Sequence, residues 1–186
     1  MEVVLASASP RRSELLHTIL PRFRVIPAAG EEKADFSLPP EEIVKSLARA
    51  KAREVASAEK DALVIGADTI VYFEGKVLGK PKDEEDAARM LRALSGRGHE
   101  VYTGYCLFSA GKEICGAVCS RVLFRDLNEE YIRRYVAGGS PLDKAGSYGI
   151  QDEDGPVLSF GGSYTNIIGL PVEEIGARLA EFGVLQ

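Results

Sequence analysis

The sequence is poor in the residues that most often build metal centres and disulfide frameworks. Two histidines and three cysteines occur among 186 residues, so the composition argues against a histidine-rich zinc site. The cysteines, Cys106, Cys115 and Cys119, are odd in number and contain no Cys-x-x-Cys pair. Because nothing resembles a signal peptide either, the sequence predicts a cytoplasmic protein with buried thiols rather than disulfides.

Long apolar runs and an excess of positive charge are also lacking. The apolar stretches fall far short of the ~20 residues that a membrane-spanning helix requires, so we expect a soluble protein without a membrane partner. The formal net charge of -5 argues against a stable nucleic-acid partner held by the whole surface. Any bound anion must therefore be held by a local cluster of basic residues.

What is present is a mixed pattern of helices and strands. Strands are predicted near 1–6, 23–26, 63–73, 76–78, 100–109 and 113–124, and helices near 10–20, 41–57, 83–94, 128–136 and from Pro171 onward. The glycine-rich segment 138–169 is expected to contain brief strands. Hairpins as well as crossovers occur in this order, which indicates an α/β fold with a mixed sheet.

The turn after the first strand is the first candidate site. Ser9 suits a helix N-cap and Pro10 suits the first helical position, so free backbone N–H groups and the helix dipole can bind an anion there. Arg11 and Arg12 fall in the first turn, where cations oppose the dipole unless an anion compensates them. The alternative is that both are solvated surface residues, paired with Glu14.

An acidic residue and a lysine lie in apolar surroundings. Asp68 interrupts the strongest apolar strand, where an unpartnered carboxylate is costly to bury. Gly66 and Ala67 have little or no side chain, which leaves room beside that strand, as expected where a ligand or metal approaches. Lys51 lies on the apolar arc of its helix, so it either extends to the edge of the core or meets a buried anion.

Two loop residues complete the candidates. Lys80, between Gly79 and Pro81, lies on a stiff loop that follows the hairpin of Asp68, so the two are expected to be neighbours. The spacing of a Walker P-loop is absent. Gln151 ends a glycine-punctuated segment, and its amide either reads a nucleobase edge or belongs to an ordinary loop.

Five motifs in a fixed order give this sequence its resemblance to a known family. The chain resembles the Maf family along essentially its whole length, through Leu5–Arg12 (LASASPRR), Gly66–Thr69 (GADT), Gly79–Lys82 (GKPK), Leu94–His99 (LSGRGH) and Asp143–Gln151 (DKAGSYGIQ), completed by Gly162–Tyr164 and Ile168–Pro171. The resemblance implies one elongated domain over 1–186, with two lobes around a central cleft. It also implies a central twisted mixed sheet flanked by helices, as in the inosine triphosphatases.

The resemblance implies roles for individual residues. Asp68 matches the catalytic acidic residue and Glu32 a second active-site carboxylate, with Glu31 beside it as the alternative. The expected substrate-binding residues are Ser7, Arg11, Arg12, Lys51, Thr69, Lys80 and Gln151, of which Arg11, Lys51 and Lys80 match phosphate ligands and Arg12, Thr69 and Gln151 match positions linked to substrate choice. Asp68 and Glu32 are expected to hold a divalent cation, Mg²⁺ or Mn²⁺, and a homodimer is implied.

The implied activity is cleavage of a nucleoside triphosphate, dTTP or UTP, at the α–β phosphate bond to a monophosphate and pyrophosphate. The resemblance also implies a house-cleaning role, which is the removal of non-canonical or modified nucleotides, linked to cell-division arrest. Two alternatives stay open: an inosine-triphosphate-type purine pyrophosphatase, and a non-enzymatic nucleotide-binding regulator of septum formation. Asp152, Glu153 and Asp154 depart from the glycine-rich pattern of relatives and add negative charge near the proposed base reader.

Overall fold

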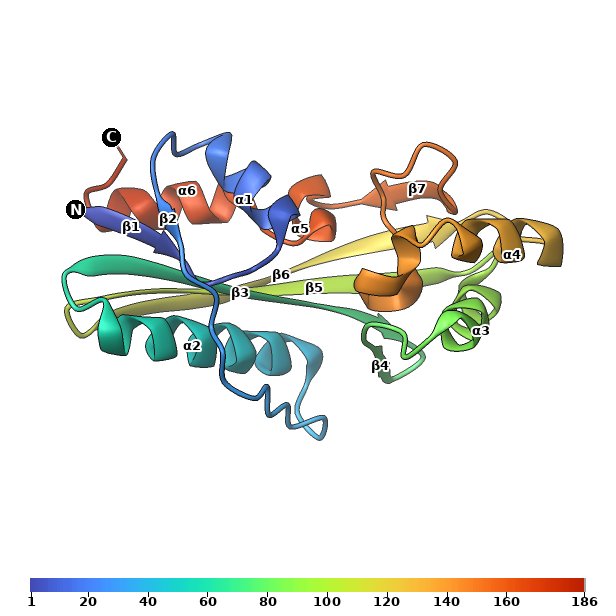
Figure 1. Cartoon of the computed structure of the whole chain (residues 1–186), viewed down its shortest axis with the longest axis horizontal. Helices are drawn as coiled ribbons and strands as arrows, with labels where there is room; N and C mark the ends of the chain where they lie inside the picture. Colours follow the sequence, from blue (N-terminus) through green and yellow to red (C-terminus); the bar gives the residue numbers. More distant parts are fainter. Residues whose placement is uncertain (186) are drawn as a thin grey trace.

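A long twisted mixed sheet runs through the computed structural model, which describes residues 1–185 (Figure 1). Its seven strands are β1 (Glu2–Leu5), β2 (Arg24–Val25), β3 (Ala62–Phe73), β4 (Lys76–Leu78), β5 (Gly98–Ser109), β6 (Lys112–Phe124) and β7 (Val157–Gly161). The order is β2-β1-β3-β5-β6-β7, with β4 added to the end of β3. Strand β1 pairs in parallel with β2 and β3, and every other pairing is antiparallel, so the predicted mixed sheet is confirmed.

Helices cover both faces of this sheet. They are α1 (Pro10–His17), α2 (Pro40–Ala58), α3 (Glu84–Leu94), α4 (Glu129–Ala137), α5 (Tyr164–Ile168) and α6 (Val172–Glu181). Helices α1, α5 and α6 lie on one face and α2 on the other, while α3 and α4 pack at the far end (Figure 1). Ser9, Asp83 and Asn128 accept backbone hydrogen bonds as N-caps, as their positions in the sequence indicate. Within the described chain, none of the helices is long and apolar enough to cross a membrane.

The glycine-rich segment 138–169 contains one of the brief strands that were predicted, and its other elements are short helices. It contains two short 3-10 helices, Ser140–Asp143 and Ala145–Ser147, followed by one strand, β7, and the helix α5. The two 3-10 helices have 4 and 3 residues and α5 has 5, which is too short for a repeated apolar pattern. The periodicity of the sequence therefore could not reveal them.

Two glycines allow α2 to lie directly on the sheet. A Cβ at Gly66 would stand 2.2 Å from the carbonyl oxygen of Ala48, and a Cβ at Gly104 would stand 2.2 Å from the backbone of Val44. Both contacts are closer than atoms can approach, so only glycine fits. The prediction that the missing side chain of Gly66 leaves room for a ligand was therefore wrong, because the backbone of α2 fills that space.

The prediction of buried thiols was also wrong. Cys106 and Cys115 face each other across β5 and β6, with Cα atoms 4.0 Å apart, and form a disulfide, whereas Cys119 is exposed. The register explains the pairing, because a two-residue turn at Ala110–Gly111 makes the two cysteines equidistant from the turn. The strands predicted at 100–109 and 113–124 leave a three-residue connection, 110–112, which would have put the two cysteines out of register.

His99 is a buried, uncharged histidine in the end of the sheet near α3 and α4. It is 4% exposed, its Nε2 lies 2.7 Å from the hydroxyl of Tyr148, and its Nδ1 has no partner. Burial lowers the pKa of His99 to about 4 from the ordinary 6.5, because the charged ring would lose its hydration.

This burial predicts a pH-dependent stability. The unfolded chain binds a proton at His99 below pH 6.5 and the folded protein does so only near pH 4, so stability falls as pH drops through this window. We expect a loss of about 2 kcal/mol in the free energy of unfolding between pH 7.5 and pH 5, measured by urea titration. His99→Gln should flatten the dependence, and His17→Gln, at an exposed histidine, should not. An equal pH slope in wild type and His99→Gln would contradict the assignment.

Candidate functional site

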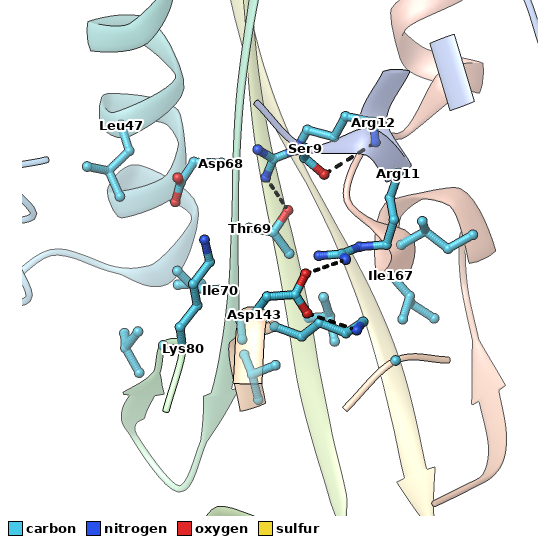
Figure 2. A pocket seen from close by; sticks show the side chains of 18 of the residues that line it. Ser9, Arg11, Arg12, Leu47, Asp68, Thr69, Ile70, Lys80, Asp143 and Ile167 are labelled. Atoms are coloured by element: carbon cyan, nitrogen blue, oxygen red, sulfur yellow. Dashed lines mark hydrogen bonds and ion pairs between the residues drawn. The ribbon is translucent and has the colours of Figure 1, made fainter. Parts of the chain in front are cut away.

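A cavity of about 720 Å³ opens beside the middle of β3 and collects residues from distant parts of the chain (Figure 2). The predicted site residues that line it are Arg11, Arg12, Glu32, Lys51, Asp68, Thr69, Lys80 and Gln151. Ser7 lines an adjoining hollow together with Arg11, Arg12, Glu32, Lys51 and Lys80. The structure therefore brings every predicted site residue to one place.

The edge of β3 explains why one cavity can collect residues from both faces of the sheet. Strand β1 pairs with residues 62–65 of β3 and β4 pairs with residues 71–73. Within residues 1–185, no strand pairs along 66–70 on that edge. Neighbouring side chains alternate between faces, so Asp68 lies on the face of α2 and Thr69 on the face of α1 and α5. Both residues still border the cavity, because they belong to the stretch 66–70 that, within the described residues, has no strand partner on this edge.

Lys51 bridges the two candidate carboxylates. Its Nζ donates to Asp68 Oδ1 at 2.6 Å and lies 2.7 Å from Glu32 Oε1. Asp68 is 8% exposed, so this ion pair compensates a carboxylate that is almost removed from water. The hydrogen bond from Lys51 is the main reason that the pKa of Glu32 is lowered, and Lys80 and Arg12 add to the effect. Of the two alternatives for Lys51, the structure selects a lysine that meets a buried anion.

Arg12 is held by the protein rather than solvated. Its Nε donates to the carbonyl of Gly169 at 2.8 Å, its Nη1 to Ser7 Oγ at 3.2 Å and its Nη2 to Thr69 Oγ1 at 3.1 Å. Burial lowers the pKa of Arg12, while the nearby charge of Asp68 acts in the opposite direction. The Ser9 side chain caps α1 by accepting from the backbone N–H of Arg12. These bonds fix the guanidinium at the start of the helix.

Arg11 has a different partner from the one considered from the sequence. Its Nη1 lies 3.1 Å from Asp143 Oδ2, whose other oxygen is 2.9 Å from Lys144 Nζ (Figure 2). Sequence reasoning gave Asp143 and Lys144 no individual role, although they begin the last of the large motifs. The signal available in the sequence was the pair of adjacent opposite charges, Asp143 and Lys144, which stands two residues before Gly146.

Lys80 and Gln151 lie at the exposed rim of the cavity. The loop of Lys80 is tied to the glycine-rich segment by a hydrogen bond from Gly146 N–H to Gly79 O at 3.1 Å. Two of the three acidic residues that follow Gln151 have partners: Asp152 accepts from the hydroxyls of Tyr135 and Ser140, and Asp154 pairs with two arginines, Arg125 and Arg134. The arginines offset the charge of Asp154, one part of the negative charge expected beside Gln151.

Apolar side chains form the rest of the wall. One group comes from the sheet and the glycine-rich segment, namely Val71, Val101, Tyr148, Ile150, Ile167 and Ile168, and the other from α2, the β3–β4 hairpin and the loop 27–39, namely Ala34, Phe36, Leu47, Ile70 and Val77. Phe36 is 67% exposed, and no pattern in the sequence singled it out. A cavity with a cationic end and apolar walls suits a ligand that joins an anionic chain to a flat ring.

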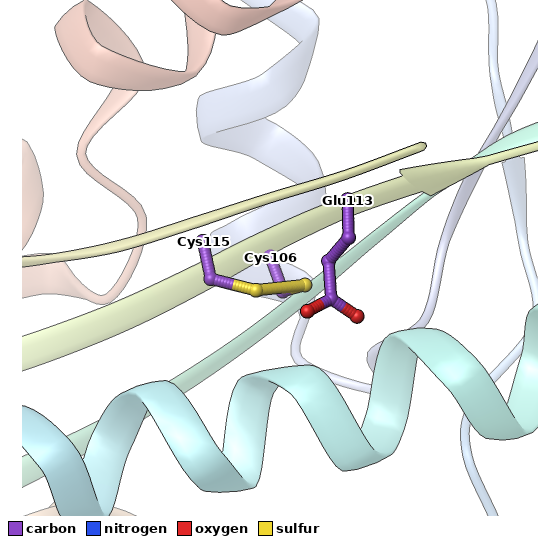
Figure 3. Close-up of side chains that lie close together, drawn as sticks. All are labelled: Cys106, Glu113 and Cys115. Atoms are coloured by element: carbon purple, nitrogen blue, oxygen red, sulfur yellow. A yellow bond between two sulfur atoms is a disulfide. The ribbon is translucent and has the colours of Figure 1, made fainter. Parts of the chain in front are cut away.

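The carboxylates fit a hard cation better than the cysteines do. Glu32 and Asp68 already converge on one positive charge, and carboxylate oxygens are the ligands that Mg²⁺ and Mn²⁺ prefer. The cluster of Cys106, Glu113 and Cys115 also gathers metal-binding atoms (Figure 3). Its sulfurs are bonded to each other, and the Glu113 carboxylate pairs with Arg49 at 2.8 Å and Arg53 at 2.7 Å, so no free ligand set remains.

Comparison with known proteins places this site in a family context. A family model described as Maf-like protein matches residues 2–182. Curated relatives named dTTP/UTP pyrophosphatase include one from Thermococcus kodakarensis, 49% identical over 183 residues that cover 97% of this chain and 96% of the relative. Another, from Moorella thermoacetica, is 50% identical over 187 residues, covering 98% of this chain and 96% of the relative.

A solved structure supports the fold. The Ham1 protein of Staphylococcus aureus superposes with a TM-score of 0.57 at 15% identity, covering 98% of this chain and all of that protein. The elongated α/β architecture with a mixed sheet is therefore confirmed as one shared with Ham1-like proteins.

Proposed function

This chain belongs to the Maf-like protein family, and we propose that it hydrolyses dTTP and UTP at the α–β phosphate bond, releasing a nucleoside monophosphate and pyrophosphate. The observation that carries the proposal is the double ion pair of Lys51 with Asp68 and Glu32 inside a cavity that Arg11 and Lys80 also line. Curated relatives that match nearly the whole chain and are named for this activity support it. Residues 1–186 act as one catalytic domain, whose two lobes meet at this cavity.

The basic residues bind the triphosphate. Arg11 belongs to the first turn of α1 and Lys80 to the loop after β4, and the two approach the cavity from different sides (Figure 2), so together they can spread over several phosphate oxygens. Arg11 pairs with Asp143, and in this proposal a phosphate group takes the place of that carboxylate as its partner. The positive end of the α1 dipole adds to the anion site, with the backbone N–H of Arg11 as a further donor, because Pro10 has no N–H and the N–H of Arg12 is bonded to Ser9.

The two carboxylates carry the chemistry. Asp68 and Glu32 are the residues that would hold Mg²⁺ or Mn²⁺, and such an ion would neutralise phosphate charge and polarise the bond to be cleaved. Asp68 also has the position to orient the attacking water and accept its proton. Lys51 keeps both carboxylates turned toward the cavity, which fixes the direction of attack before the substrate binds.

The apolar walls and the rim bind the nucleoside. The base lies between aliphatic side chains such as Ile150 and Ile167, and the exposed amide of Gln151 offers both a donor and an acceptor to its edge. Arg12 and Thr69, which are bonded to each other, lie where the phosphate end meets the apolar end and contribute to substrate choice.

A panel of nucleoside triphosphates tests the proposal. With Mg²⁺ or Mn²⁺, pyrophosphate release from UTP and dTTP should exceed release from ITP, GTP and ATP by at least about tenfold in kcat/KM, and EDTA should abolish it. Preference for ITP would support the purine alternative. Tight binding of nucleotides with no pyrophosphate from any of them would support the non-enzymatic alternative and contradict hydrolysis.

The remaining expectations from the sequence and from the resemblance stay predictions. They are the homodimer, the cytoplasmic location, and the house-cleaning role with its link to cell-division arrest. The homodimer can be checked directly by light scattering of the purified full chain, because a single species of twice the monomer mass is expected.

A further inference from the structure

A series of hydrogen bonds through two threonine hydroxyls runs from the cavity into the core of the sheet. Arg12 Nη2 donates to Thr69 Oγ1 at 3.1 Å, and Thr69 Oγ1 lies 2.9 Å from Thr103 Oγ1 on the neighbouring strand β5. Thr103 Oγ1 in turn lies 2.9 Å from the backbone carbonyl of Asn166. Thr69 borders the cavity, whereas Thr103 is fully buried.

The Asn166 carbonyl at the end of this series determines which threonine donates in each hydrogen bond. A carbonyl oxygen only accepts, so the single hydroxyl proton of Thr103 goes to Asn166. Thr103 therefore has no proton left for Thr69, and the bond between the two threonines is donated by Thr69. Thr69 therefore donates its only proton to Thr103, and its oxygen already accepts one hydrogen bond from Arg12 Nη2. One lone pair of Thr69 Oγ1 remains, so toward the cavity this group can only accept.

The position of that carbonyl is itself fixed. The Asn166 side chain is buried, and its Nδ2 donates to the carbonyl of Val101 at 3.1 Å and to Ser120 Oγ at 2.8 Å. Ser120 passes its own proton to the carbonyl of Ser163 at 2.9 Å. These bonds attach α5 to β5 and β6, so the acceptor that orients Thr103 cannot turn away without breaking buried hydrogen bonds.

We propose that Thr103 is a positioning residue that makes Thr69 an acceptor-only group, so that the site selects a substrate able to donate a hydrogen bond there. The inference rests on the proposed function, because it concerns which nucleotides the same cavity takes. UTP and dTTP share two such donors, the imide N–H of the base and the 3′-hydroxyl of the sugar. CTP has a ring acceptor in place of the imide N–H, and 3′-deoxy-UTP lacks the hydroxyl.

Thr103→Val tests the proposal, because valine has the shape of threonine but offers Thr69 no acceptor. The Thr69 proton is then free to turn toward the cavity. We expect the preference for UTP over CTP, or over 3′-deoxy-UTP, to fall by about tenfold, the size expected when a mismatched buried group regains a partner. Thr103→Ser keeps the hydroxyl and should retain the preference within about twofold. Which preference falls identifies the donor that meets Thr69.

Two readouts separate this proposal from the proposed function. The preference is measured as kcat/KM for pyrophosphate release, and again as Kd for non-cleavable α,β-methylene analogues, which needs no turnover. If wild type binds these analogues with a preference but releases no pyrophosphate from UTP, hydrolysis fails and the role of Thr103 is still tested by binding.

A matched control separates polarity from packing. Ser120→Ala removes a buried hydroxyl from the same network. It leaves the bond from Asn166 Nδ2 to the Val101 carbonyl, which still holds α5 against β5, and it leaves Thr103 as the acceptor for Thr69. It should lower the melting temperature and keep the preference. The proposal is overturned if Thr103→Val changes all substrates equally, if Ser120→Ala reduces the preference as much, or if wild type discriminates against neither analogue.

Discussion

Asp68→Asn is expected to lower kcat for pyrophosphate release by at least about 10³-fold while nucleotide affinity stays within a few-fold of wild type. Asparagine keeps the shape of aspartate and can still accept the hydrogen bond from Lys51 Nζ, so the cavity should keep its geometry. It cannot take a proton from water, and it is a poorer ligand for a hard cation. Both possible roles of Asp68 are therefore lost together, whichever one it performs.

The measurement separates chemistry from binding and from folding. Pyrophosphate release gives kcat, titration with a non-cleavable analogue gives Kd, and thermal unfolding reports whether the variant is intact. Asp61→Asn is a matched control, because Asp61 is an exposed carboxylate directly before the same strand. A turnover number for Asp68→Asn within about tenfold of wild type would remove this residue from the catalytic role.

Gly104→Ala is expected to destabilise the protein by at least about 3 kcal/mol, among the largest effects of a single methyl group. The added Cβ would meet the Val44 backbone at 2.2 Å, and backbone of a packed helix cannot move aside as a flexible side chain can. Gly66→Ala should act in the same way, because its Cβ would meet the carbonyl of Ala48 at 2.2 Å.

This prediction also concerns the site. Gly104 is paired directly with Asp68, and the helix that it admits carries Lys51, so a displaced α2 also displaces the ion pair. Urea unfolding measures the stability, and Gly161→Ala on strand β7 is the control, because a Cβ there meets nothing within 4 Å and the backbone is not left-handed. Gly104→Ala with a stability within about 1 kcal/mol of wild type would show that α2 can shift without cost.

Much of the fold was predictable because its signals are local. Caps such as Ser9 and Asn128, and the β-branched run around Asp68, predicted elements that the structure contains. The lysine on the apolar arc of α2 was recognisable for the same reason, since helical periodicity puts Lys51 among buried residues. The order of the motifs then indicated the family.

Other features depend on register and on packing between distant segments. The Cys106–Cys115 disulfide depends on whether the hairpin turn has two residues or three, which the sequence around Gly111 does not distinguish. The partner of Arg11 lies 132 residues away at Asp143. The role of Gly66 was misread because a helix backbone and a ligand both require the same absence of a side chain.

The sequence by itself determined which residues are unusual for their surroundings: a carboxylate in an apolar strand, a lysine on a core face and two arginines at a helix start. Those are local conflicts between charge and burial, and they can be recognised from neighbouring residues. Only the tertiary structure decided that they gather at the unpaired edge of β3, where Lys51 pairs with Asp68 and the two arginines line the same cavity. It also decided that the hydroxyl of Thr69 points inward, because Thr103 donates to the Asn166 carbonyl of α5, far along the chain, and can therefore only accept from Thr69.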